Sequence, residues 1–172
     1  MDRRHFLTHL VAAAGVAGLD LHYLSRLRAQ PRVDGDRLNR TITELARFGA
    51  TPEGGTSRVA FSPEDIAARE YVAGLMRQAG LRVDVDAAAN LIGRRPGSEP
   101  LPPLMFGSHI DSVPEGGNYD GQVGSMAAVE VARTLADEAL TTRHPLELVI
   151  FSNEEGGKTG SRAMSGEVRP RE

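Results

Sequence analysis

Apolar residues recur at intervals of three and four positions in the first half of the chain, a spacing typical of amphipathic helices. Residues 37–48 carry this pattern, and Gly49 is expected to end this first helix. A second helix is predicted to begin at Pro63, because Ser62 can act as its N-cap and proline suits the first helical position. Gly80 is expected to close it. The residues predicted to face the core from the second helix are Ile66, Val72, Leu75, Met76 and Ala79.

Shorter runs of apolar or alternating residues predict strands. Two are expected at residues 81–85 and 90–94, where the first alternates apolar and charged positions. Two more are expected at residues 104–107 and 146–151. The end of the last run is continuously apolar, which indicates a strand covered on both faces of a sheet.

Residues 123–140, rich in alanine and leucine, predict a helix between the last two strands. A strand, a helix and a buried strand form a βαβ unit, and such units build parallel sheets. The pattern therefore predicts an α/β fold. In open sheets of this class, ligands bind beyond the carboxyl ends of the strands.

The composition is that of a globular domain: 172 residues, 40% hydrophobic and 25% charged. The formal net charge is -3 and Lys158 is the only lysine, so the sequence offers no basic patch and excludes nucleic acid as a partner. The chain has no cysteine, which excludes disulfides and thiolate metal sites. Any metal must be bound by nitrogen and oxygen, which favours zinc, manganese, cobalt or nickel.

The first 30 residues read as a targeting segment. Arg3 and Arg4 precede a weakly apolar stretch at residues 6–19, which looks like a twin-arginine export signal. The stretch is too short to span a bilayer, so no stable membrane anchor is expected. A periplasmic or secreted location follows. The alternative is a surface helix that begins with two arginines, in a cytoplasmic protein.

Candidate metal ligands follow both strands of the βαβ unit. His109 follows the first strand, and Asn153, Glu154 and Glu155 follow the second. His109 could bind a metal ion through a ring nitrogen while Asp111 orients the ring. Asp120 precedes the connecting helix, where backbone amides favour a carboxylate, and from there it could bridge two cations.

The adjacent glutamates offer two different tasks. Neighbouring residues in extended chain point in opposite directions, so one of Glu154 and Glu155 could bind metal while the other handles protons. Each residue also has an ordinary structural interpretation: a hydrogen-bonded loop for His109, a turn for Asp111, a helix cap for Asp120 and a solvated surface for the glutamates. Their common position at one sheet edge favours a metallohydrolase.

Residues 107–124 and 151–156, together with 58–65 and 86–93, resemble the M20 metallopeptidase family, and within it the hydantoinase/carbamoylase group. The resemblance covers residues 37–166 and implies a three-layer α/β/α domain with a largely parallel central sheet. It implies two divalent metal ions, zinc first and manganese, cobalt or nickel otherwise. The roles that it implies are metal ligation by His109, Asp120 and Glu155, with Asp120 bridging, general acid/base catalysis by Glu154, and support of the site by Asp111.

The resemblance also implies a substrate class. Family members cleave a linear amide, typically the carbamoyl C–N bond of a small N-carbamoyl amino acid, and form homodimers. They are longer than this chain, so residues 31–172 are expected to be the N-terminal part of the catalytic domain, without the inserted dimerisation domain or the C-terminal part. Such a fragment is expected to lack normal activity. The alternatives are an M20 aminoacylase or dipeptidase, and a non-catalytic fragment.

Overall fold

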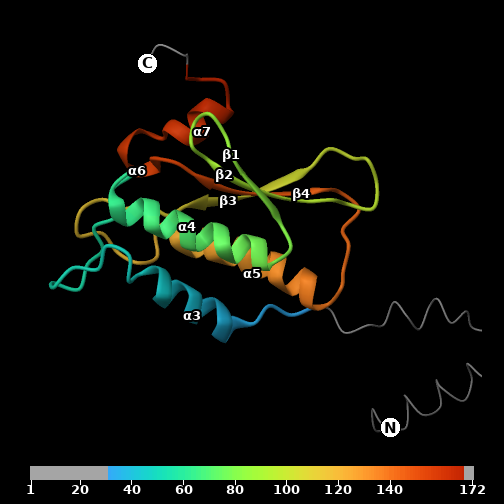
Figure 1. The fold of residues 1–172 in the computed structure, drawn as a ribbon, viewed down its shortest axis with the longest axis horizontal. Coiled ribbons are helices and arrows are strands. Elements are labelled where there is room, and N and C mark those ends of the chain that lie inside the picture. Colours follow the sequence, from blue (N-terminus) through green and yellow to red (C-terminus); the bar gives the residue numbers. More distant parts are fainter. Residues whose placement is uncertain (1–30, 169–172) are drawn as a thin grey trace, which may run out of the picture. The chain divides into compact units, whose positions relative to one another are not determined.

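The structure is a computed structural model and describes residues 31–168. Along the chain the elements are α3 (Gly35–Leu45), α4 (Pro63–Gln78), β1 (Arg82–Val85), β2 (Leu91–Arg95), β3 (Leu104–His109), α5 (Gln122–Asp137), β4 (Leu146–Phe151), α6 (Glu154–Gly157) and α7 (Thr159–Met164) (Figure 1). Among the described residues, no helix is long and apolar enough to cross a membrane. The predicted export signal at residues 1–30 lies outside them.

The four strands form one sheet in the order β1-β2-β4-β3. Strands β3 and β4 pair in parallel through the connection α5, so the predicted βαβ unit and the α/β class are confirmed. The sheet as a whole is mixed, because β1 pairs with β2 and β2 with β4 in antiparallel fashion. A turn at residues 86–90 joins β1 directly to β2, and so short a connection permits only an antiparallel pair.

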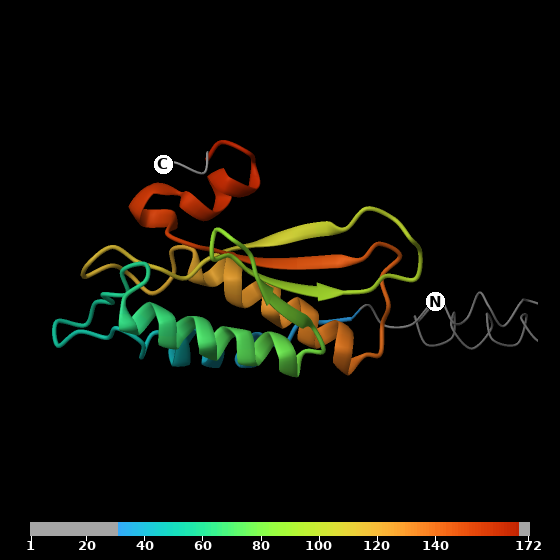
Figure 2. The ribbon, with the colours of Figure 1, turned by 45° about the horizontal axis from the view of Figure 1, so that its top comes forward.

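Helices α4 and α5 cover one face of the sheet, and α3 packs on α5 (Figure 2). Helix α7 lies on the other side, at the carboxyl end of β4. The side chains that fill the space between sheet and helices are apolar and almost fully buried. They include Leu45, Val72, Met76, Ile110, Met126, Val129, Leu148 and Ile150.

Local capping explains the helix boundaries. Helix α4 begins at Pro63 as predicted, and the Ser62 side chain accepts a hydrogen bond from the amide of Asp65. Helix α3 begins at Gly35, before the predicted residue 37, because Asp34 accepts a hydrogen bond from the Arg37 amide at 2.8 Å and so acts as the N-cap.

The prediction that Ile66 faces the core is wrong, because this residue is 58% exposed. Its neighbour Asp65 takes the inward position and accepts a hydrogen bond from the Phe61 amide at 2.8 Å. The spacing of apolar residues did not show whether position 65 or position 66 faces the core. A polar side chain can occupy the buried position when it is hydrogen-bonded locally, as Asp65 is. The other four residues predicted for this stripe are buried.

Candidate metal centre

His109 is the last residue of β3 and lies opposite Phe151, the last residue of β4. Its side chain is only 7% exposed, and its carbonyl oxygen accepts a hydrogen bond from the Ser125 hydroxyl at 2.7 Å. The imidazole ring lies against Gly121, the residue before α5. The pairing of β3 with β4 and the hydrogen bond from Ser125 of α5 therefore fix the backbone of His109. Gly121 fixes the position of its ring.

Asp111 lies behind the ring. The Nδ1 atom of His109 is 3.1 Å from the carbonyl oxygen of Asp111 and 3.5 Å from its Oδ1. Burial opposes a charge on the ring, but the hydrogen bond and the negative charge of Asp111 outweigh it, so the pKa of His109 is raised. With Nδ1 directed at Asp111, Nε2 is left to face the carboxylates at the sheet edge.

The Asp111 carboxylate also contacts the glutamate segment, because its Oδ2 accepts a hydrogen bond from the Glu155 amide at 3.1 Å. Burial disfavours the charged carboxylate, yet the nearby imidazole of His109 and the hydrogen bonds from the amides of Glu155 and Glu154 prevail and lower the pKa of Asp111. A buried, ionised acid thus connects the histidine to the glutamates. This position matches the supporting role that the sequence predicted for Asp111, which stays a prediction.

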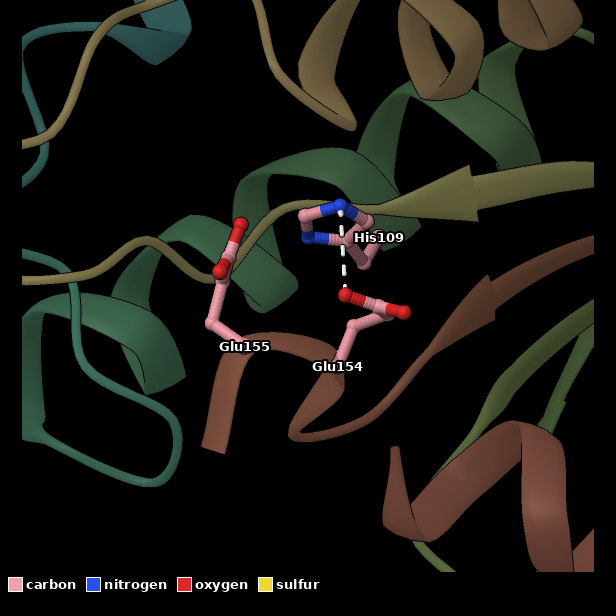
Figure 3. Close-up of side chains that lie close together, drawn as sticks. All are labelled: His109, Glu154 and Glu155. Atoms are coloured by element: carbon pink, nitrogen blue, oxygen red, sulfur yellow. Dashed lines mark ion pairs between the residues drawn. The ribbon is translucent and has the colours of Figure 1, made fainter. Parts of the chain in front are cut away.

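Glu154 and Glu155 occupy the first turn of α6, after Asn153 in the left-handed conformation (φ 49°). The expectation that they lie in extended chain is therefore wrong. Successive residues of a helix differ by about 100° rather than 180° in direction, and both carboxylates face His109 (Figure 3). One ligand atom from each of the three residues lies within 4.8 Å of the other two.

Glu154 has contacts on both of its oxygens. Its Oε2 is 3.9 Å from Nε2 of His109, and its Oε1 is 3.7 Å from the Lys158 ammonium. The side chain is 26% exposed, so this carboxylate can meet solvent or a ligand as well as the histidine. The lysine contact was not predicted, because Lys158 reaches it only through the helical turn of α6.

Asp120 approaches the same ring from the α5 side. Its Oδ1 is 3.8 Å from Nε2 of His109, but its side chain is 85% exposed and it does not belong to the close group of three. No side-chain hydrogen bond caps α5, whose N-cap is Gly121, so Asp120 does not act as the helix cap. Its bridging role stays a prediction.

Arg58 was not predicted to have a role, although it lies in one of the segments that carry the family resemblance. Its side chain is fully buried and donates hydrogen bonds to the carbonyl oxygens of Ile110 (2.6 Å), Leu45 (3.0 Å) and Phe48 (2.7 Å). Its main chain pairs with Ser112, whose amide donates to the Arg58 carbonyl at 2.9 Å. Arg58 therefore holds the loop that carries Asp111 through the residues on both sides of it, Ile110 and Ser112.

The donor set fits a divalent metal ion of the zinc or manganese type. One imidazole nitrogen and two or three carboxylates are ligands that these ions accept. Asp111 Oδ1 is a buried oxygen with no hydrogen-bond partner among the described residues, and it lies 3.5 Å from Nδ1 of His109. An acid behind a histidine is the usual outer partner of a metal-bound imidazole.

Comparison with known proteins gives concordant results. The profile of peptidase family M28 matches residues 90–171. An N-carbamoyl-L-amino acid amidohydrolase of Geobacillus stearothermophilus is 44% identical over 144 residues, which are 80% of this chain and 35% of that protein. A ureidoglycolate hydrolase of Oryza sativa is 41% identical over 78% of this chain and 29% of its own length.

A solved structure is similar as well. The crystal structure of a hydantoinase/carbamoylase family amidase from Burkholderia ambifaria superposes with a TM-score of 0.78 at 42% identity. The match covers 81% of this chain and 36% of that one. The chain thus spans about a third of the length of the relatives it matches. The predicted hydantoinase/carbamoylase group is confirmed, whereas the matching peptidase profile is that of M28 and the prediction named M20.

Proposed function

Because the chain belongs to the hydantoinase/carbamoylase family of amidases, we propose that the protein hydrolyses a linear amide C–N bond, most simply that of a small N-carbamoyl amino acid. The observation that carries this proposal is the meeting of His109, Glu154 and Glu155 at the carboxyl edge of two parallel strands. Relatives at 44% and 41% identity are named for the hydrolysis of a carbamoyl amino acid and of ureidoglycolate.

His109, Asp120 and Glu155 would hold two divalent ions, with Asp120 between them and zinc as the first candidate. When bound, such ions supply Lewis acidity toward the scissile carbonyl and the attacking water. Asp111 keeps Nδ1 of His109 occupied, so that Nε2 points toward the carboxylates. Gly121 leaves room for the ring.

Glu154 would act as the general acid/base. It would accept a proton from the attacking water and deliver it to the leaving nitrogen as the C–N bond breaks. For an N-carbamoyl amino acid the products are the free amino acid, carbon dioxide and ammonia. The position of Glu154 supports this role, because its carboxylate is partly exposed and borders both His109 and Lys158.

Two further features belong to the same proposal. Residues 1–30 would direct the protein through a twin-arginine pathway to the periplasm or the exterior, as the paired arginines before an apolar stretch suggest. The whole protein would act as a homodimer, in keeping with the family resemblance.

The main alternative is an aminoacylase or dipeptidase. The match of residues 90–171 to a peptidase family favours it, because the same acids and metals can open a peptide bond. A protein that binds metal without catalysis is the second alternative.

Hydrolysis assays separate these functions. The whole protein, purified and supplied with Zn²⁺ or Mn²⁺, is offered an N-carbamoyl-L-amino acid, the matching N-acetyl amino acid and a dipeptide. We expect the carbamoyl substrate to be hydrolysed with the highest kcat/KM. Preference for the acetylated substrate or the dipeptide would establish the alternative enzyme, and metal binding without turnover of any of the three would contradict both enzymatic functions.

The role of Glu154 has its own test. Glu154→Gln should lower kcat by about 100-fold or more, because a general base contributes about 10²–10⁴-fold, while metal affinity stays near that of the wild type. Glu64→Gln makes the same change at an exposed position of α4 and should leave kcat unchanged. Full activity of Glu154→Gln would remove this residue from the mechanism.

A further inference from the structure

Asn90 is a fully buried polar residue outside the candidate metal centre. It immediately precedes β2, at the end of the turn that joins β1 to β2, and none of its side chain is exposed. It lies in the segment 86–93 that carries part of the family resemblance, to which the proposed chemistry gives no role. A buried amide of this kind is retained only when its hydrogen-bonding capacity is satisfied.

Three hydrogen bonds fix the amide of Asn90. Its Oδ1 accepts from the backbone amide of Ser152 at 3.0 Å. Its Nδ2 donates to Asp86 Oδ2 at 2.8 Å and to the carbonyl oxygen of Gly160 at 3.1 Å. One backbone donor, one backbone acceptor and one carboxylate thus determine the orientation of the side-chain amide.

The two backbone partners enclose the glutamate segment. Ser152 is the first residue after β4, and Gly160 lies in the first turn of α7, so residues 153–159 between them include both glutamates. The Gly160 amide also donates to the Ser152 carbonyl at 2.9 Å, which closes the segment into a loop. Asn90 therefore holds both ends of the loop against the β1–β2 turn.

Space and further contacts agree with this arrangement. A Cβ at Gly160 would overlap Oδ1 of Asn90, so the close approach requires glycine. The Ser152 hydroxyl donates to the carbonyl oxygen of Ala88 at 2.5 Å, a second link between the loop and the same turn. Asp86 holds the turn itself, since its Oδ1 accepts from the amides of Ala88 and Asn90.

We propose that Asn90 is a positioning residue of the metal centre: it fixes the loop 153–159 so that the carboxylates of Glu154 and Glu155 meet His109. The inference rests on the proposed function in so far as His109 and Glu155 bind metal and Glu154 handles protons beside them. Asn90 touches none of them directly, and it acts through the backbone of Ser152 and Gly160.

The first test reverses donor and acceptor. Asn90→Asp keeps an acceptor for the Ser152 amide but sets a carboxylate oxygen against Asp86 and the Gly160 carbonyl. The double variant Asp86→Asn/Asn90→Asp restores a donor between positions 86 and 90. We expect Asn90→Asp to weaken Mn²⁺ binding by about tenfold or more in isothermal titration, as is usual when a group that supports a metal ligand is lost. The double variant should recover part of the lost affinity.

A second variant leaves Asn90 in place. Gly160→Ala introduces a methyl group that displaces the Asn90 oxygen, and it should weaken Mn²⁺ binding as well. Gly74→Ala is its matched control, because Gly74 also lies in a helix and a Cβ there meets nothing within 4 Å. Asn39→Asp, at an exposed position of α3, controls for the added charge.

Amide hydrogen exchange gives a readout that does not depend on metal or turnover. Exchange of the backbone amides at positions 152 and 160 should accelerate in Asn90→Asp and in Gly160→Ala. The double variant Asp86→Asn/Asn90→Asp should exchange more slowly than Asn90→Asp. Val72→Ala, a core variant in α4 remote from the loop, should lose thermal stability without weakening Mn²⁺ binding. Equal weakening by Val72→Ala at matched stability would reduce Asn90 to a structural residue and overturn the inference.

The remaining outcomes separate the two proposals. Wild-type protein that binds Mn²⁺ but hydrolyses no carbamoyl amino acid contradicts the proposed function and leaves the positioning inference intact. If Asn90→Asp and Gly160→Ala both fold and bind Mn²⁺ within about twofold of the wild type, the positioning inference alone is contradicted. Such a change is much smaller than the loss expected when a group that supports a metal ligand is removed. Wild-type protein that binds no Mn²⁺ contradicts both.

Discussion

The imidazole of His109 lies against the Cα of Gly121, so closely that a Cβ at position 121 would overlap ring atoms Nε2, Cδ2 and Cε1. Gly121 also has a φ of 68°, a conformation that residues with a side chain rarely adopt. Close approach and backbone conformation thus both require glycine at this position. The contact with Gly121, directly before α5, therefore determines the orientation of the His109 ring.

Gly121→Ala should therefore displace the ring of His109 and weaken metal binding. We expect a loss of affinity of about tenfold or more, as for other groups that orient a metal ligand. Isothermal titration with Zn²⁺ measures it. Gly117→Ala serves as the control, because a Cβ there meets nothing within 4 Å. Unchanged Zn²⁺ affinity in Gly121→Ala would show that the ring is not held by this contact.

Arg58 should be important for stability. Arg58→Met keeps much of the aliphatic stem but leaves the carbonyl oxygens of Ile110 and Phe48 without this donor in a buried environment. Buried unsatisfied polar groups cost about 1–3 kcal/mol each, so we expect the free energy of unfolding to fall by about 3 kcal/mol. Urea denaturation followed by circular dichroism measures this change.

Arg40→Met provides the comparison, since Arg40 is exposed on α3. Substitutions at such surface positions usually change the free energy of unfolding by less than about 0.5 kcal/mol. An equally small effect at Arg58 would mean that the buried guanidinium does not hold the loop at Ile110.

Asp65 should make stability depend on pH. Burial raises the pKa of this carboxyl above its ordinary value of 3.8, and the hydrogen bond from the Phe61 amide and the charge of Arg69 only partly oppose this effect. A raised pKa in the folded state means that the acid favours folding most below pH 3.8 and loses this contribution as the pH rises through the folded pKa.

The comparison with Asp65→Asn shows that dependence. The free energy of unfolding of the wild type, relative to Asp65→Asn, should fall as the pH rises above 3.8 in urea titrations. Asp36→Asn, the same substitution at an exposed position of α3, serves as the control. A difference that grows in favour of the wild type at neutral pH would indicate a stabilising ion pair at Asp65 instead.

Much of the fold follows from local sequence. The Ser62-Pro63 pair places the start of α4, and the continuous apolar run at residues 146–151 corresponds to β4. The βαβ unit then brings His109 beside the segment that begins at Ser152, because parallel neighbours end at the same edge. That topological rule is why the sequence alone groups the candidate ligands.

The features that were not predicted depend on contacts between distant segments. The antiparallel placement of β2 beside β4 leaves no local mark in either strand, and the helical turn at Glu154 follows from the left-handed Asn153. Nothing in the sequence indicates that polar residues such as Arg58 and Asn90 are buried. Arg58 bonds Ile110, 52 residues away, and Asn90 bonds Ser152, 62 residues away, so only the folded chain reveals what they support.

The central claim, that a metal ion is held at His109 by residues of this sheet edge, is tested most directly by Zn²⁺ titration of two histidine variants. His109→Ala should weaken binding by more than about 100-fold, because losing a ligand exceeds the 10–100-fold effect of an outer partner. His144 lies in the connection before β4, and its ring contacts the carbonyl oxygen of Pro102. The variant His144→Ala should therefore bind Zn²⁺ as the wild type does. Both variants keep the other histidines of the chain. Equal Zn²⁺ affinity of His109→Ala and His144→Ala would contradict the account.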